Sequence, residues 1–377
     1  MKIVTVMNTE ARGGAEFAAL EMLDALIARG HSAVLLSERP DVADQHEVES
    51  RAVDLGPKLR LSTWRTLLVK WPSIVKALRT ELEKEAPYDV LLLHFKMEQL
   101  LARWLPKRLR PLVVWAEWGP VPFPMRKGLP RRMYLNAAKH ADVIMAISES
   151  TRQNLIDVGI PAEKVTYIPN VMRADQLDFT NAGRKVVRAQ LDIPRSAFVV
   201  GCVSRFHPKK RNDVVINAVA QVDGAHLLMA GEGETEESLR ELAAPLGDRA
   251  HFVRTPGDDI SAFVSAFDVS VFCPSPTEGA PRAVLLAMLA RRPPLSTGAE
   301  GVAPMIRDGV GVITSPENDV DALVKVLREY QGDKKRRKRE GELARERIAS
   351  THGFDVVAEQ VEQLWQSAAA ANGSTKS

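Results

Sequence analysis

The sequence predicts a two-domain α/β protein in which each domain is built around a doubly wound parallel sheet. A chain of 377 residues is long for a single domain. Short apolar runs rich in β-branched residues alternate with amphipathic helical stretches through both halves, which is the pattern of βαβ units. This periodicity is lost at residues 171–185, and we therefore place the linker between the domains there.

The composition indicates a soluble globular protein and argues against some classes of function. Hydrophobic residues make up 45% of the chain and charged residues 26%. A net charge of +3 is too small to indicate a partner that is a nucleic acid. Cys202 and Cys273 both stand in apolar strand-like runs, so we expect buried free thiols in a reducing compartment.

The chain carries no predicted targeting or membrane-spanning segment. Its first residues, MKIVTVMN, form too short an apolar run for a signal peptide. No window reaches the roughly 18 uninterrupted apolar residues that span a bilayer. We therefore expect a cytoplasmic protein, with peripheral contact at the inner face of a membrane as an open alternative.

The first half alternates between predicted strands and helices. Strands are expected at residues 2–7, 33–36, 89–94, 111–115, 142–146 and 165–168. Helices are expected at residues 17–29, 64–85, 133–140 and 148–158. Gly30 is placed to end the first helix and Ser148 to cap the start of the last one.

The second half repeats the pattern. Strands are expected at residues 198–203, 226–230, 250–253 and 269–273, and helices at residues 214–220, 236–246, 260–267, 320–330 and 354–369. The charged run at 333–340 is interpreted as a solvated helix face, and residues 371–377 as a disordered tail.

A βαβ unit at residues 269–301 has the features of a ligand site. A polar loop follows its first strand, and ligands bind at the carboxyl ends of such strands. Glu278 is a lone carboxylate in this loop and could hold sugar hydroxyls; capping the next helix is the structural alternative. The backbone N–H groups of Ala280 and Arg282 could bind sugar or phosphate oxygens, whereas Pro281 has none to offer.

A second loop offers two cations. Arg205 and Lys210 follow a predicted strand and are close enough in sequence to reach one anion, although two solvated surface cations would look the same. Two glycine-containing loops also follow strands: Gly13 with Gly14, and the triplet Gly231, Glu232 and Gly233. Glycine permits a close approach to a nucleotide, but tight turns of this kind are common.

Together these motifs resemble the retaining glycosyltransferases of family four over nearly the whole chain. The matching elements are the Glu278-Gly279-x-Pro281 loop, the Gly-x-x-x-Arg-(x)4-Lys loop ending in Arg205 and Lys210, and Gly-Glu-Gly at 231–233. The resemblance implies the GT-B fold, with two Rossmann-like domains facing a central cleft. It implies an acceptor domain at 1–180, a donor domain at 181–352, and a helix at 353–370 that packs back on the first domain.

The resemblance also implies an activity: transfer of a sugar from a nucleoside-diphosphate sugar to the hydroxyl of a glycan, lipid or small-molecule acceptor. The donor is a co-substrate, and neither a metal nor a cofactor is expected. Arg205 and Lys210 would hold the diphosphate. Donor contacts would come from the loops named above together with Thr255, and Glu278 would contact the sugar.

The acceptor side is expected in the first half. The resemblance places Glu16 in the first loop, which faces the donor phosphate and the acceptor, and His94 at the end of a strand. Trp118 occupies the position of the family's histidine, so Glu117 is the hypothetical substitute that orients the acceptor. For His94 a purely structural role stays equally open.

Two further departures from the family pattern lie in the 269–301 stretch. Leu286 replaces a second glutamate that binds ribose hydroxyls in the family, with Glu300 as a speculative substitute, and Arg291 replaces a glycine. With Trp118, they motivate an alternative: a non-catalytic binding or scaffold protein. Asp319 and Asp321 form an Asp-x-Asp pattern, which binds metals in other transferases. They begin a predicted helix, so a helix cap is favoured here.

The charge distribution of the first half is uneven. Residues 58–139 hold 17 Lys and Arg against six Asp and Glu, with tryptophans interspersed. Such a face could contact an anionic membrane or hold an acidic acceptor. Solvated helices around core tryptophans are the plain alternative.

Overall fold

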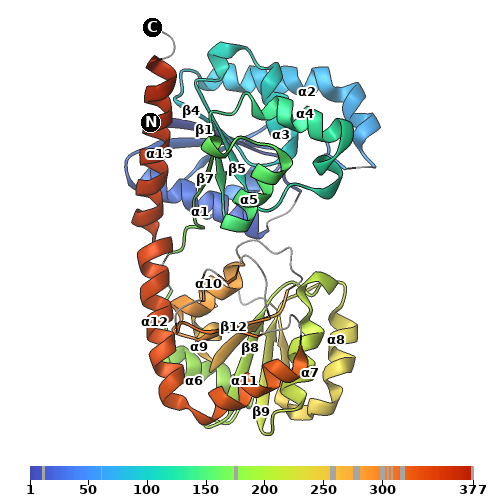
Figure 1. The fold of residues 1–377 in the computed structure, drawn as a ribbon, viewed down its shortest axis with the longest axis vertical. Helices are drawn as coiled ribbons and strands as arrows, with labels where there is room; N and C mark the ends of the chain where they lie inside the picture. The colour runs from blue at the N-terminus through green and yellow to red at the C-terminus, as the bar shows by residue number, and fades with distance from the viewer. Residues whose placement is uncertain are drawn as a thin grey trace. The chain divides into compact units, whose positions relative to one another are not determined.

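The computed structural model describes residues 1–10, 13–60, 62–173, 177–254, 260–274, 281–297, 302–303, 305–306, 309–314 and 319–374. The chain divides into two compact units. Unit 1 comprises Met1–Val171 and Phe354–Ser377, and unit 2 comprises Met172–Gly353. The predicted class, two doubly wound α/β domains, is confirmed in both units (Figure 1).

Unit 1 has a seven-stranded parallel sheet in the order β3-β2-β1-β4-β5-β6-β7. Its strands are β1 Lys2–Met7, β2 Ser32–Ser37, β3 Glu49–Ala52, β4 Val90–Leu93, β5 Leu112–Glu117, β6 Val143–Ala146 and β7 Val165–Tyr167. Its α-helices are α1 Gly14–Ala28, α2 Trp64–Glu85, α3 Lys96–Leu101, α4 Gly128–Ala138, α5 Glu149–Val158 and α13 Phe354–Ser374. Short 3₁₀ turns are η1 Pro40–Ala43, η2 Ala102–Trp104, η3 Lys107–Leu109, η4 Phe123–Arg126 and η5 Ala162–Lys164.

Unit 2 has a six-stranded parallel sheet in the order β10-β9-β8-β11-β12-β13. Its strands are β8 Phe198–Val203, β9 Ala225–Ala230, β10 Ala250–Val253, β11 Val269–Phe272, β12 Pro294–Ser296 and β13 Val312–Ile313. Its α-helices are α6 Asn181–Gln190, α7 Asn212–Ala220, α8 Glu236–Ala243, α9 Ile260–Ser265, α10 Arg282–Leu289, α11 Val320–Gly332 and α12 Lys334–His352, with 3₁₀ turns η6 Pro208–Lys210 and η7 Ala244–Arg249.

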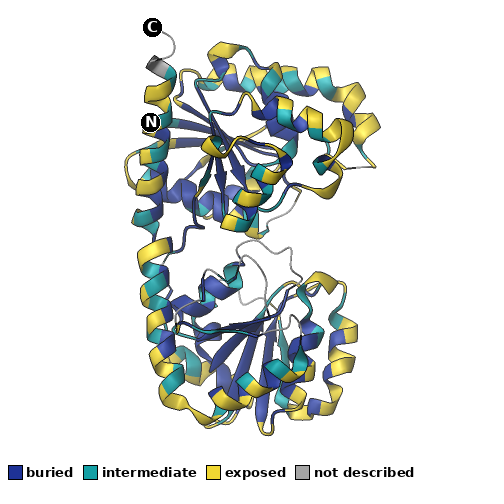
Figure 2. Ribbon diagram, viewed as in Figure 1, coloured by how far each residue is buried: buried dark blue, intermediate teal, exposed yellow. Residues whose placement is uncertain are grey.

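Each sheet has an apolar core on both faces. Successive side chains of a strand point to opposite faces, so Val4 and Val6 join one core of unit 1 while Ile3 and Met7 join the other. Helices α2, α4 and α5 cover the first face, and α1 and α13 cover the second. The inner strands of both sheets are therefore buried and nearly continuously apolar, as parallel sheets covered on both sides must be, whereas the edge strand β3 is largely exposed (Figure 2).

The final helix, α13, belongs to unit 1. Trp365 of α13 is fully buried in the core beside α1. At the helix surface, Glu362 accepts hydrogen bonds from Arg29 at 2.8 Å and from His31 at 2.7 Å. The predicted disordered tail at 371–377 begins too early, because α13 continues to Ser374.

The boundary between the units also differs from the predicted 180/181. Residues 177–180 pack in unit 2: Leu177 joins its core, and Thr180 caps α6. Helix α6, Asn181–Gln190, takes in the last five residues of the stretch 171–185 that was predicted as a linker. Its polar sequence hid its periodicity, because it buries an arginine, Arg188, that donates to the Asp268 carboxylate at 2.8 Å.

Smaller predictions have mixed outcomes. Ser148 caps α5 by accepting from the Thr151 N–H, and Cys202 and Cys273 are buried free thiols, both as predicted. The charged run at 333–340 is helical in α12 from Lys334 but is only partly solvated. The Arg336 guanidinium donates to Glu340 at 2.8 Å, and Arg337 donates to main-chain carbonyls at the end of α11.

Candidate active site

The loop after β8 brings both predicted cations to the carboxyl edge of the unit 2 sheet. The Arg205 side chain is exposed and makes no ion pair with any described residue. Lys210 Nζ lies 5.4 Å from the centre of the Phe272 ring at the end of β11. Strands β9 and β11 flank β8 on opposite sides, so these cations stand where the strand order reverses, the usual ligand position of a doubly wound sheet.

A short turn and a left-handed residue set the backbone path of this loop. His207 Nδ1 accepts the Lys209 N–H at 3.1 Å and opens the short turn η6. Arg211 then adopts a left-handed conformation, with φ 46°, directly before α7. The N-cap residue of α7, Arg211, makes no side-chain hydrogen bond to the amino terminus of the helix. The first N–H groups of α7 therefore add to the positive potential of the loop.

Sequence reasoning missed Asn212, which positions the loop. Its Oδ1 accepts the Ser204 hydroxyl at 2.8 Å, which ties the end of β8 to the start of α7. Its Nδ2 is buried without a hydrogen-bond partner among the described residues. In the sequence, its position as a polar residue directly after a cationic loop could have identified Asn212 as a residue of the site.

The Gly-Glu-Gly triplet has a clear structural cause. A Cβ on Gly231 would lie 1.9 Å from the Ser204 carbonyl oxygen, and a Cβ on Gly233 would lie 2.1 Å from that of Phe206. The Phe206 N–H donates to the Glu232 carbonyl at 2.9 Å. The two glycines therefore let the β9 loop run against the loop that carries Arg205, so the triplet supports the cation loop itself.

Part of the predicted donor site lies outside the described residues: Thr255, Glu278, Gly279, Ala280 and Glu300. Of the same loop, Pro281 is described at the start of α10, and Arg282 is the first residue of that helix. Leu286 is half-buried on α10 and packs against the unit 2 core. An apolar residue there fits the packing of the helix.

Arg291 stands where the family pattern has glycine, and its backbone explains that pattern. Its φ is 57°, in the left-handed region that favours glycine at the end of a helix. The side chain offsets this cost with two bonds to Asp178, at 2.9 and 3.1 Å, and a contact with Glu342. These bonds lower the pKa of Asp178 and join three segments of unit 2.

In unit 1, His94 is held by hydrogen bonds on both ring nitrogens. Its Nδ1 accepts the Trp118 indole N–H at 3.2 Å, which leaves Nε2 to donate to the Thr5 hydroxyl at 2.7 Å. The ring also stacks on Trp118 with an interplanar angle of 16°. Burial lowers the pKa of His94 to about 3, so the imidazole is neutral at physiological pH.

Glu117 ends β5 in a buried ion pair. Its carboxylate accepts from Lys96 Nζ at 2.6 Å and from the Tyr134 hydroxyl at 2.9 Å. Burial lowers the pKa of Lys96, and the pair with Glu117 opposes that shift. Glu117 shares its face of the sheet with Trp115, whereas Trp118 packs on the opposite face, so the two predicted acceptor residues do not converge.

The first loop is held together by Glu16. This buried carboxylate on α1 accepts from the Thr9 hydroxyl at 2.7 Å, and Lys58 Nζ lies 3.9 Å from it. A Cβ on Gly13 would lie 2.9 Å from Glu16 Oε2, so Gly13 leaves room for that carboxylate. Gly14 begins α1.

A buried carboxyl at the same edge was missed from the sequence. Glu98, on α3, accepts the Phe95 N–H at 2.7 Å and the Asn8 N–H at 3.4 Å, so it joins the loops after β1 and β4. Burial raises its pKa to about 8. A glutamate three residues after a helix start is a known capping signal, which could have identified it.

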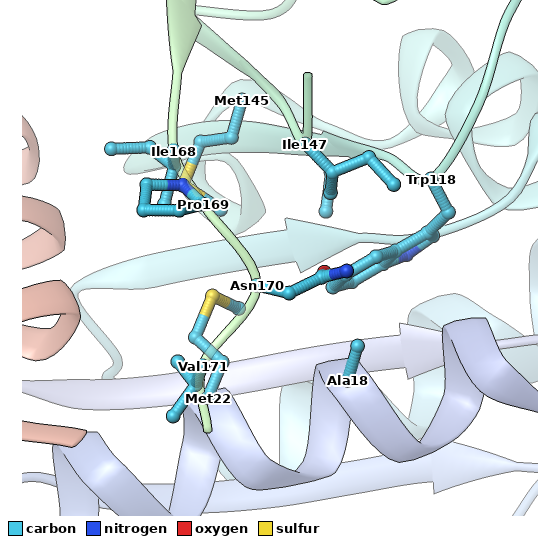
Figure 3. A pocket seen from close by; sticks show the side chains of 10 residues that line it. Ala18, Met22, Trp118, Met145, Ile147, Ile168, Pro169, Asn170 and Val171 are labelled. Carbon is cyan, nitrogen blue, oxygen red and sulfur yellow. The ribbon is translucent and has the colours of Figure 1, made fainter. Parts of the chain in front are cut away.

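A small apolar hollow opens beside Trp118 (Figure 3). It lies past the carboxyl ends of β5, β6 and β7, with the Ala18 and Met22 side chains of α1 on its other side. Its lining is Ala18, Met22, Ala116, Trp118, Met145, Ile147, Ile168, Pro169, Asn170 and Val171. No charged side chain lines it, and its volume of about 10 Å³ leaves room for little more than one water molecule.

Two further features concern metals and membranes. Asp319 caps α11 by accepting from the N–H groups of Asp321 and Ala322, at 2.9 and 3.1 Å, so the predicted cap is confirmed. Within the described ranges, no three potential metal-binding side chains come together. In the same ranges, no helix combines the length and apolarity needed to cross a bilayer.

Comparison with known families decides the assignment. The profile described as "Glycosyltransferase Family 4" matches residues 12–176, and that described as "Glycosyl transferases group 1" matches residues 197–333. The chain belongs to the group 1 glycosyltransferases. It is thus a glycosyltransferase of GT-B type, and the family resemblance predicted from its motifs is confirmed.

Curated relatives and solved structures agree with the family. The group 1 chain is 27% identical to the lipopolysaccharide core biosynthesis glycosyltransferase LpsE of Rhizobium meliloti, over 96% of this chain and 98% of the relative. It is 28% identical to a GDP-mannose-dependent phosphatidylinositol monomannoside mannosyltransferase of Mycobacterium tuberculosis, over 58% of this chain and 60% of the relative. These relatives are named for transferase activity and give no support to the scaffold alternative.

The fold of this group 1 glycosyltransferase is shared with structures of low sequence identity. Anabaena Alr3699/HepE in complex with UDP and glucose has a TM-score of 0.80 at 20% identity, over 97% of this chain and 100% of that chain. Sucrose-phosphate synthase from Thermosynechococcus elongatus has a TM-score of 0.81 at 19% identity, over 98% and 99%.

Proposed function

We propose that this glycosyltransferase moves a sugar from a nucleoside-diphosphate donor to an acceptor hydroxyl, with retention at the anomeric carbon and without a metal. The observation that carries the proposal is the pair Arg205 and Lys210 at the reversal point of the unit 2 sheet. Two cations beside an uncapped helix terminus can neutralise a diphosphate. This is the task that a divalent ion performs in other transferases.

The proposed chemistry forms one bond as another breaks on the same face of the sugar. The bond from the anomeric carbon to the diphosphate oxygen breaks, and the acceptor oxygen bonds to that carbon. The departing phosphate oxygen takes the acceptor's proton. Arg205 and Lys210 stabilise the negative charge that develops on the diphosphate, which is where fixed cations lower a barrier most.

The named relatives support a nucleotide-sugar donor and a glycan or lipid acceptor. The mycobacterial relative is named for GDP-mannose and a phosphatidylinositol mannoside, and the rhizobial one for lipopolysaccharide core biosynthesis. The HepE structures hold UDP or UDP-glucose. We propose a glycan or glycolipid acceptor.

The test is a donor screen followed by product analysis. UDP- and GDP-sugars are assayed first for slow donor hydrolysis and then for transfer to lipid-linked glycans. We expect one donor to be turned over, NMR of the product to show the donor's anomeric configuration, and excess EDTA to leave the rate unchanged. Inversion would refute retention, and loss of activity on chelation, restored by a divalent cation, would refute metal independence.

We also propose that unit 1 contacts an anionic membrane through the amino-terminal ends of α2 and α4. Among the described residues, ten of the thirteen exposed large apolar side chains belong to unit 1. Six of them form what we call the α2–α4 surface: Trp64, Leu68, Val69, Phe123, Leu129 and Met133. Both helices cover the same face of the sheet and begin at its carboxyl edge.

The charge of the α2–α4 surface matches such a partner. Residues 58–80 contain six cations and no acidic residue, and residues 118–141 contain five cations and no acidic residue. Arg65, Lys70, Lys127 and Arg132 are exposed and form no ion pair with a described residue. Exposed apolar side chains next to unpaired cations suit the interface of an anionic bilayer.

Vesicle co-sedimentation tests this contact. We expect binding to vesicles that contain phosphatidylglycerol, weaker binding at higher salt, and loss in Leu68→Ser/Val69→Ser. The matched control is Val186→Ser/Leu343→Ser, which removes exposed apolar groups from unit 2 and should change nothing. Equal binding to neutral vesicles, or equal loss in the control, would refute the proposal.

A further inference from the structure

A basic hollow opens at the amino edge of the unit 1 sheet, the edge opposite the residues discussed above. Its cationic lining residues are Lys107, Arg110 and Lys139, with His140 beside them. The remaining lining residues are Pro111, Val113, Asp142 and Asn372. We refer to it as the amino-edge hollow.

The topology brings these cations together. Strands β5, β6 and β7 are consecutive neighbours in the sheet, and a basic segment precedes each of them. Arg110 comes before β5, Lys139 and His140 before β6, and Lys164 before β7. Because parallel strands begin at the same edge, the side chains converge. Lys164 Nζ donates to the carbonyls of Lys139 and Ala141 at 3.2 and 2.7 Å, which fixes two of the segments to each other.

Among the described residues, the positive charge of the hollow is not balanced by ion pairs. No described carboxylate forms an ion pair with Lys107, Arg110 or Lys139. The one acidic lining residue, Asp142, accepts the Val113 N–H at 2.7 Å. The pKa of His140 is lowered by burial and then by Arg110, Arg103, Lys164 and Lys139, so these cations surround the imidazole.

Arg110, which lines the amino-edge hollow, has one unused donor. Arg110 Nε is buried and has no hydrogen-bond partner among the described residues. Buried donors are nearly always paired in folded proteins, so a missing acceptor is the simplest explanation. An anion bound by the Arg110 guanidinium would balance the surrounding positive charge.

We propose that the amino-edge hollow binds a phosphate group, as a phosphomonoester or a diphosphate. Arginine offers two parallel N–H donors that match phosphate oxygens, and the two lysines add point charges. The hollow lies at the opposite edge of the sheet from the carboxyl-edge loops of unit 1, so this site is additional to the donor site of unit 2. The proposal does not depend on the function proposed above.

Calorimetric titration with inorganic pyrophosphate tests the site. The titration uses the full chain carrying Arg205→Ala/Lys210→Ala, so that the cation pair of unit 2 cannot contribute. We expect one saturable site, weakened at least about tenfold by adding Arg110→Gln/Lys139→Gln. The control, Lys334→Gln/Lys338→Gln, removes two exposed cations from α12 and should leave the affinity unchanged.

Two further arms identify the source of the phosphate. Soluble glycerol phosphate represents a free metabolite, and phosphatidic acid in neutral carrier vesicles represents a lipid headgroup. Binding in either arm that Arg110→Gln/Lys139→Gln abolishes supports the site. If no probe binds in a way that depends on these residues, or if the α12 control loses as much affinity, the proposal is overturned. Lys107→Gln, at an exposed position, provides a variant that does not endanger folding.

Discussion

The two units are built alike but use their carboxyl edges differently. In unit 2 the first strand, β8, is followed by Arg205, which no described residue neutralises. In unit 1 two ionisable groups that end strands at the same edge are already engaged: Glu117 by Lys96, and His94 by Trp118 and Thr5. A charged side chain without an ion-pair partner is available to bind a ligand, whereas one that is paired within the unit contributes to stability. The difference is consistent with the donor diphosphate that we propose at the carboxyl edge of unit 2.

The exposed apolar residues show the opposite distribution. They gather on unit 1, at the ends of α2 and α4, and are few among the described residues of unit 2. The membrane contact that we propose for unit 1 would use these apolar and aromatic groups together with the exposed cations of the α2–α4 surface. A lipid-linked acceptor would match such a unit, and a nucleotide-sugar would match unit 2.

Arg205→Ala should have the largest effect. We expect activity to fall about 1000-fold, or ~4 kcal/mol in barrier, because a fixed cation facing the departing diphosphate is lost. The thermal midpoint should not change, since the side chain makes no ion pair with a described residue. The control Arg195→Ala removes an exposed arginine from the loop before β8. Activity within about tenfold of wild type would remove Arg205 from the mechanism.

Glu117→Gln should act on stability instead. Removing one partner of a buried ion pair leaves the Lys96 charge uncompensated, and we expect about 3 kcal/mol less stability in urea unfolding. Glu149→Gln, which breaks an exposed pair with Arg152, should cost under about 0.5 kcal/mol. If kcat falls steeply while stability holds, Glu117 has the acceptor-orienting role predicted from the sequence.

His94 should make unit 1 sensitive to acid. Its pKa is about 3 in the folded chain and near 6.5 in the unfolded chain. Between these pH values the unfolded state binds more protons, so the free energy of unfolding decreases as the pH is lowered. From pH 7 to pH 5 the wild type should lose about 2 kcal/mol more than His94→Gln. Parallel pH profiles for the two proteins would show that His94 is not held neutral.

Arg291→Gly should have the smallest effect. Glycine relieves the left-handed backbone by about 1 kcal/mol, but the bonds to Asp178 and Glu342 are lost. We expect a net change within about 1 kcal/mol, whereas Arg291→Ala, which loses the bonds and keeps the strain, should be the less stable variant. Equal stability of the two variants would show that the φ of 57° costs nothing.

Much of the fold could be predicted from the sequence because its signals are local. Buried parallel strands need apolar residues on both faces, so residues 2–7 and 198–203 were recognisable without any contact information. The elements that were missed depend on partners far away in the chain. Helix α6 is polar, and its buried Arg188 is stable only because Asp268, some 80 residues later, accepts its hydrogen bonds.

The sequence by itself determined the α/β class, the family and the cation pair, because these follow from periodicity and from motifs within short segments. Only the tertiary structure decided which charged side chains have an ion-pair partner and which do not. Glu117 ends a strand and Arg205 follows one, and the sequence alone does not tell which of the two charges has a partner. Glu117 meets Lys96 across the fold, and Arg205 meets no described carboxylate, since ion pairs depend on distance in space and not on separation along the chain.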